Sequence, residues 1–162
     1  MSYIKFKDVS VYFQGNTGGE VTALDNLNVE FEKGTINVII GASGSGKTTL
    51  LNCIANKVLY NGEIFIDSQE IKNTKVQNRK ISYVNQEATL YPGLTVYENI
   101  AFPLVNSKEK YDVYDPKVKD VASKLGITFL LTRKPKFISV GQASRVCIAR
   151  AIAKKSDIYL FD

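Results

Sequence analysis

Apolar and polar residues alternate along the first third of the chain, which is the pattern of half-buried β-strands. The alternation runs through residues 3–13 and returns at Leu27, Val29 and Phe31. Residues 36–40 (INVII) are instead almost continuously apolar, which predicts a strand that is buried on both faces. Further short strands are predicted at residues 62–67, 80–84 and 157–161.

Helical patterns dominate the second half of the chain. Thr95 and Glu98 have the spacing of a capping box, which predicts a helix that begins there. Asp115 and Pro116 predict another helix, with the aspartate as N-cap and the proline in the first helical position, and Gly126 predicts its end. Two more helices are expected at residues 47–55 and 143–153. Strands, then helices, then a final strand indicate an α/β fold class.

The composition of the chain excludes several classes of protein. The chain is 44% hydrophobic and 23% charged, which excludes a disordered or collagen-like chain. Its two cysteines, Cys53 and Cys147, exclude a disulfide scaffold and predict reduced thiols in the core. No apolar run approaches the roughly 18 residues that span a bilayer, and residues 1–8 contain no signal core, so secretion is not expected.

The net charge and the histidine content limit the partners and the mechanisms that this sequence allows. The net charge of +5 is modest and forms no long basic stripe, which argues against a nucleic-acid partner. The sequence contains no histidine, so a mechanism that needs one is excluded within this chain.

The clearest chemical motif is a glycine-rich loop between a predicted strand and a predicted helix. Residues 41–48 (GASGSGKT) match G-x-x-x-x-G-K-[ST] at every fixed position. Glycines free the loop amides to face phosphate oxygens, the lysine would bridge the β- and γ-phosphates, and the threonine hydroxyl would face Mg²⁺. The predicted ATP-contacting residues of this loop are Gly41, Ser43, Gly44, Ser45, Gly46, Lys47, Thr48 and Thr49.

A second stretch shows which class of phosphate-binding protein this sequence resembles. Residues 138–145 (ISVGQASR) resemble the signature motif LSGGQxxR of ATP-binding cassette (ABC) ATPases. The resemblance implies a P-loop NTPase of ABC type, with a mixed or parallel core sheet, an N-terminal antiparallel β subdomain and a helical subdomain. It divides the single domain into a nucleotide-binding core, residues 1–85 with 145–162, and a helical part, residues 86–144, and it places further strands after Asp162.

The same resemblance assigns roles to residues outside the loop. Gln86 corresponds to the Q-loop sensor, and Phe13 to the aromatic residue that stacks on adenine, with Tyr12 as the alternative. The implied Mg²⁺ ligands are Thr48, Gln86 and Asp162, and the implied signature contacts to nucleotide are Ser139, Gly141 and Gln142. Val140 departs from the family pattern, because it stands where the signature has a glycine, and a β-branched residue is expected to restrict the backbone there.

The resemblance also implies a function. Two such domains, identical or different, would bind ATP and Mg²⁺ between them in a head-to-tail dimer, and they would drive multi-span membrane subunits from the cytoplasmic face of the membrane. A solute-binding protein would be a further partner. The family's catalytic glutamate and switch histidine would follow Asp162, so the 162 residues alone are expected to be inactive.

The sequence leaves open the direction of transport and the presence of a membrane partner. Residues 90–104 look like importer ATPases, whereas residues 21–25 look like lipoprotein-release or macrolide-export ATPases. The alternative to a transport ATPase is an ABC-type ATPase without a membrane partner, which acts in DNA repair or translation.

Overall fold

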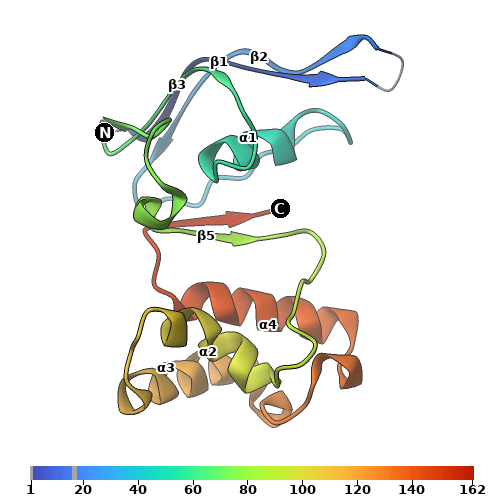
Figure 1. Ribbon diagram of the computed structural model, residues 1–162, viewed down its shortest axis with the longest axis vertical. Helices are drawn as coiled ribbons and strands as arrows, with labels where there is room; N and C mark the ends of the chain where they lie inside the picture. Colours follow the sequence, from blue (N-terminus) through green and yellow to red (C-terminus); the bar gives the residue numbers. More distant parts are fainter. Residues whose placement is uncertain (1, 16–17) are drawn as a thin grey trace. The chain divides into compact units, whose positions relative to one another are not determined.

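The structure is a computed structural model that describes residues 2–15 and 18–162. The chain divides into two compact units, Met1–Arg79 and Lys80–Asp162 (Figure 1). The first unit contains β1 (Ser2–Gln14), β2 (Glu20–Glu32), α1 (Lys47–Ile54), β3 (Asn61–Ile66), β4 (Gln69–Glu70) and the 3₁₀ turn η1 (Val76–Arg79). The second unit contains β5 (Ile81–Val84), α2 (Val96–Asn106), α3 (Tyr111–Lys124), the 3₁₀ turns η2 (Thr128–Leu130) and η3 (Pro135–Phe137), α4 (Val140–Ala153) and β6 (Ile158–Phe161).

The first unit is built on an antiparallel sheet with strand order β2-β1-β3-β4. Its fully buried side chains include Phe6, Val9 and Val11 of β1 and Ile64 of β3. Val9 and Val11 follow the alternation of a strand, whereas an irregularity in the register lies between Phe6 and Val9. The helix α1 buries Leu50, Cys53 and Ile54, and Figure 1 shows it on one side of the sheet. The strands predicted at residues 3–13 and 62–67 are therefore confirmed, while β2 starts seven residues before Leu27.

The strand predicted at residues 36–40 is wrong. These residues belong to no strand, and the exposed fraction is 96% for Ile36 and 90% for Ile40. An apolar strand that is buried on both faces needs paired neighbours in a sheet and covering layers. The described part of the first unit offers residues 36–40 no pairing partner, since the bonded strands of its sheet are β1 to β4.

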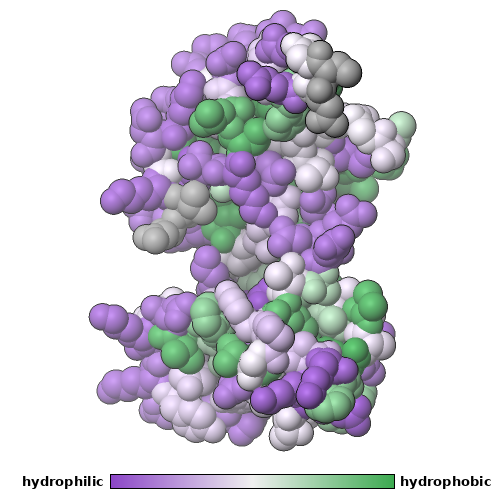
Figure 2. Space-filling view, turned by 45° about the vertical axis from the view of Figure 1, so that its right-hand side comes forward, coloured by the Kyte–Doolittle hydropathy of each residue, from purple (hydrophilic) through white to green (hydrophobic). Residues whose placement is uncertain are grey.

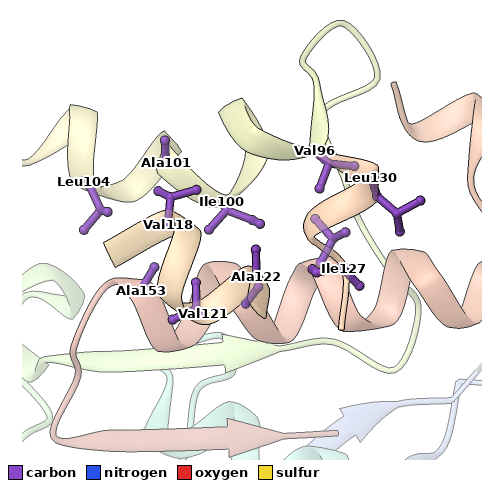
Figure 3. Close-up of a cluster of buried hydrophobic side chains, with 12 residues drawn as sticks. Val96, Ile100, Ala101, Leu104, Val118, Val121, Ala122, Ile127, Leu130 and Ala153 are labelled. Carbon is purple, nitrogen blue, oxygen red and sulfur yellow. The ribbon is translucent and has the colours of Figure 1, made fainter. Parts of the chain in front are cut away.

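The second unit pairs β5 and β6 in parallel, from Ile81 opposite Ile158 to Val84 opposite Phe161. Three helices, α2, α3 and α4, enclose a separate apolar core, and Figure 3 shows its side chains pointing toward one another. The fully buried members of this core are Val96, Ile100, Val118, Ala122, Ile127, Leu130, Val146 and Ala149. Figure 2 shows hydrophobic patches between hydrophilic side chains on the surfaces of both units.

The helix starts were predicted with mixed success. Thr95 caps α2, and its side chain and that of Glu98 form the expected capping box. By contrast, α3 begins at Tyr111, after the N-cap Lys110, and Pro116 lies inside the helix, so the predicted start at Asp115 is wrong. The Asp115 carboxylate does not cap because it accepts hydrogen bonds from Tyr97 Oη at 2.8 Å and pairs with Lys119 at 2.8 Å.

The structure also bears on the predicted end of the third helix, on the two cysteines and on membrane-spanning segments. Gly126 has φ +64° directly after the C-cap of α3, which confirms it as the stop. Cys53 and Cys147 are buried and free, and burial raises the pKa of Cys53 to about 12. No helix within the described ranges, 2–15 and 18–162, is long and apolar enough to cross a membrane.

Candidate nucleotide-binding site

The glycine-rich loop in the first unit has a conformation that requires glycine at Gly46. This residue has φ +88°, a left-handed backbone region that other residues rarely adopt. A Cβ atom at Gly46 would lie 2.5 Å from the carbonyl oxygen of Ala23 and 3.0 Å from Cδ2 of Leu24. The loop therefore passes β2 in close backbone contact, and Gly46 then becomes the N-cap of α1 without any side-chain cap.

Lys47 folds back over the loop that precedes it. Its ammonium group donates hydrogen bonds to the carbonyl oxygens of Gly41 at 2.9 Å and Ala42 at 2.7 Å, and it lies 3.4 Å from Ser45 Oγ. The loop is tight, because a Cβ atom at Gly41 would lie 2.6 Å from Ser45 Oγ. The first turn of α1 contains no acidic residue, so its positive end and the lysine charge both favour an anion at this loop.

Tyr12 and Phe13 are consecutive residues of β1, so they lie on opposite faces of this strand. Val11 pairs with Leu24, the residue next to Gly46, and alternation along β1 puts Phe13 on the same face as Val11. Tyr12 consequently faces the other way. The exposed fractions are similar, 45% for Phe13 and 42% for Tyr12. The two candidates for stacking on adenine therefore differ in the face of β1 on which they lie and not in their accessibility.

Gln86 and Asp162 lie at one edge of the second unit's parallel pair. Gln86 follows β5 and Asp162 follows β6, and the carboxyl ends of parallel strands meet at the same edge. The Asp162 amide donates to Val84 O at 3.0 Å, which fixes the strand end. Gln86 is exposed there.

Tyr83 is a site residue that the sequence analysis missed. Its hydroxyl donates a hydrogen bond to the Asp162 carboxylate at 3.1 Å. Burial, followed by this bond and the charge of Asp162, raises the pKa of Tyr83 to about 12. The available signal was the strand register, since Tyr83 pairs with Leu160 and Asp162 is the next residue on that face of β6.

The proposed ion ligands fit Mg²⁺ by their chemistry. The hydroxyl of Thr48, the amide of Gln86 and the carboxylate of Asp162 all offer oxygen, the donor that Mg²⁺ prefers. Thr48 belongs to α1 of the first unit, and the other two belong to the second unit. Across the described residues there is no group of three or more His, Cys, Asp or Glu side chains that could hold a metal ion.

The signature stretch forms the start of α4, three residues earlier than predicted. Ser139 is the N-cap, its Oγ accepts from the Gln142 amide at 3.3 Å, and its own amide donates to Gln142 Oε1 at 3.0 Å. Val140 is the first helical residue, with an exposed fraction of 82% and no left-handed backbone. The valine is thus compatible with the helical start of α4, and its expected effect on an approach to phosphate stays a prediction.

Comparison with known proteins decides the family. The sequence profile of the ABC transporter family matches residues 24–162. The chain belongs to the ABC transporter family. Its fold agrees, because a solved dimeric ATP-binding cassette bound to ADP and Pi superposes with a TM-score of 0.89 at 29% identity, covering 98% of this chain and 73% of that one. The predicted α/β P-loop NTPase fold of ABC type is confirmed.

Two curated relatives of this ABC chain are import proteins. The trehalose/maltose import ATP-binding protein of Thermococcus litoralis is 40% identical over 151 residues, which is 89% of this chain and 41% of that protein. The glucose import ATP-binding protein of Saccharolobus solfataricus is 40% identical over 168 residues, which is 100% of this chain and 47% of that protein. The chain therefore spans less than half the length of these relatives.

Proposed function

We propose that this chain is the ATP-binding part of an ABC import transporter, which couples ATP binding and hydrolysis to solute passage through membrane subunits. The observation that carries the proposal is the loop at residues 41–47, which contacts β2 through Gly46 and gathers a lysine charge and a helix N-terminus. The similarity to sugar-import ATP-binding proteins supports import over export. It also favours a transport role over one in DNA repair or translation.

The first unit would hold the nucleotide. Lys47 would exchange its loop carbonyls for the β- and γ-phosphates, and the amides of Ser43, Gly44 and Ser45 would face phosphate oxygens. Phe13 would stack on adenine, because it shares a face of β1 with Val11, whose partner Leu24 touches the loop.

Bound Mg²⁺ would screen phosphate charge. Thr48 would supply a hydroxyl oxygen, Gln86 an amide oxygen and Asp162 a carboxylate oxygen, with Tyr83 holding the orientation of that carboxylate.

The second unit would also serve a partner cassette. In a head-to-tail dimer, homomeric or heteromeric, Ser139, Gly141 and Gln142 of one chain would face the nucleotide on the other. Because the Gln142 side chain is engaged in capping Ser139, the groups offered would be the backbone amides of the first turn of α4. Multi-span membrane subunits and a solute-binding protein would complete the transporter, and this chain would then lie at the cytoplasmic face of the membrane.

Hydrolysis is expected of the whole transporter and not of these 162 residues assayed alone. The family's glutamate and switch histidine have no counterpart among them, and the sequence contains no histidine. Loss of a general base lowers rates by about 10²–10⁴. Purified 162-residue chain should therefore bind ATP without turnover above background.

Calorimetric titration of Mg-ATP tests the binding site. Lys47→Ala should weaken binding by about 10–100-fold, because a charge-assisted contact to phosphate is lost. Lys75→Ala removes an exposed lysine of the same unit and should leave affinity unchanged. Phe13→Ala should weaken ATP about 5–100-fold through lost stacking, while Tyr12→Ala should not. Equal affinity of the Lys47→Ala and parent chains would refute the assignment.

A further inference from the structure

Arg150 of α4 contacts the segment that follows Gln86. Its guanidinium donates a hydrogen bond to the carbonyl oxygen of Thr89 at 2.7 Å and lies 5.5 Å from the centre of the Tyr91 ring. Among the described residues Arg150 forms no ion pair, and its guanidinium contacts a carbonyl oxygen, an aromatic ring and, at 3.8 Å, the sulfur of Cys147. Hydrogen bonds from charged donors are about twice as strong as neutral ones.

The same segment is held on its other side by α2. Asn99 is completely buried, its Oδ1 accepts from the Tyr91 amide at 2.8 Å, and its Nδ2 donates to the Tyr91 carbonyl at 3.1 Å. The Phe102 ring lies 4.3 Å from the Tyr91 ring, centre to centre. Tyr91 is therefore fixed to α2 by its backbone and its ring, and to α4 by Arg150.

This arrangement joins two functional stretches of the second unit. Thr89 comes three residues after Gln86, and Arg150 lies eleven residues after Ser139 in the same continuous helix. At about 1.5 Å per residue, about 16 Å of helix separate the contact from the start of the signature. A displacement of residues 86–91 would pull on α4 at Arg150 and so move the helix that begins at Ser139.

We propose that Arg150 is a positioning residue that ties the segment after Gln86 to α4 and transmits its displacement to the signature end of that helix. The transmission step rests on the proposed function, whereas the tie itself does not. Arginine suits this role because its planar group donates to a carbonyl and stacks on a ring at once, whereas a lysine ammonium is a compact point charge that lacks the planar, stacking fork.

Hydrogen exchange of the full 162-residue chain tests the tie without nucleotide. Arg150→Lys keeps the charge and the helix propensity, so the chain should fold, but amides of residues 89–94 should exchange roughly 10-fold faster. Lys124→Ala on α3 is the matched control, because it also alters one cation and its ion pair with Asp120 is exposed. Unchanged exchange at residues 89–94 in both Arg150→Lys and Arg150→Ala would overturn the tie.

Exchange with saturating Mg-ATP tests the transmission. In the parent chain, ATP should change protection both at residues 86–95 and in the first turn of α4. In Arg150→Lys, the affinity for ATP should stay within about twofold, since Lys47 and its loop are untouched, and the response of α4 should disappear. A persistent α4 response in Arg150→Lys would overturn the transmission. A parent chain that binds no ATP would refute the proposed function, while the nucleotide-free exchange would still decide the tie.

Discussion

Substitution of three glycines by alanine should separate three different physical effects. Gly46→Ala places a Cβ atom 2.5 Å from a backbone oxygen and also forces alanine into φ +88°. Gly44→Ala meets nothing within 4 Å but has φ +79°. Gly141→Ala also meets nothing within 4 Å, and it lies in α4 without a positive φ.

The magnitudes follow from these geometries. A left-handed backbone costs an alanine about 1–2 kcal/mol, so Gly44→Ala should lower the free energy of unfolding by that amount. Gly46→Ala adds about 1–3 kcal/mol for overpacking against Ala23 and should lose about 2–5 kcal/mol in total. Gly141→Ala should gain about 0.5 kcal/mol, because alanine loses less conformational freedom in a helix than glycine.

Urea unfolding followed by circular dichroism measures this series. Tyrosine fluorescence provides a second probe, since the sequence has nine tyrosines and no tryptophan. Stability should rank Gly141→Ala above the parent, then Gly44→Ala, then Gly46→Ala. If Gly46→Ala is as stable as Gly44→Ala, the close approach of the loop to β2 does not exist, and the proposed position of the nucleotide beside β2 is refuted.

Further substitutions test other features. Asn99→Ala should lower the unfolding free energy by about 2–4 kcal/mol, because it leaves buried backbone groups of the loop before α2 unpaired; a loss below 1 kcal/mol in urea would contradict this. Burial and the hydrogen bond to its aspartate partner raise the pKa of Tyr97 above its usual value of 10, so its stabilisation is complete below pH 10 and is lost as the pH rises above it. Tyr97→Phe should therefore reduce the fall in urea midpoint between pH 9 and pH 11, and an identical fall would exclude this cause. The exposed segment 36–40 should promote self-association, so Val38→Lys with Ile40→Lys should lower the apparent mass in light scattering if the parent associates through it. Because a β-branched residue is expected to restrict the backbone that approaches phosphate, replacing the exposed Val140 in Val140→Gly should raise ATP turnover of the complete transporter, and a decrease would contradict this expectation.

Local signals predicted most of the elements correctly. The capping box at Thr95 and Glu98 needs only residues three positions apart, so it could be recognised from the sequence. The same holds for the glycine-rich loop, whose strain at Gly46 is a property of its own backbone. The contact with Ala23 could not be foreseen, because it joins residues more than twenty positions apart.

The two errors share a cause in tertiary context. Residues 36–40 have the composition of a buried strand, but the sheet of the first unit leaves them unpaired. Asp115 and Pro116 have the pattern of a helix start, yet Tyr97 from α2 binds that carboxylate and the helix begins at Tyr111. Gln142 was predicted only as a contact to nucleotide, and its bonds to Ser139 show that it also caps α4.

The two capping boxes of the second unit differ by one charge. In α2 the reciprocal cap is Glu98, whose pKa is lowered by the backbone bond from Thr95, so a full negative charge cancels the positive end of that helix. In α4 the same bonds are made by Gln142, and no acidic residue occupies the first turn. The local potential at the start of α4 therefore stays positive while every capping bond is kept. A glutamate at position 142 would preserve the geometry of the helix start and abolish its attraction for an anion.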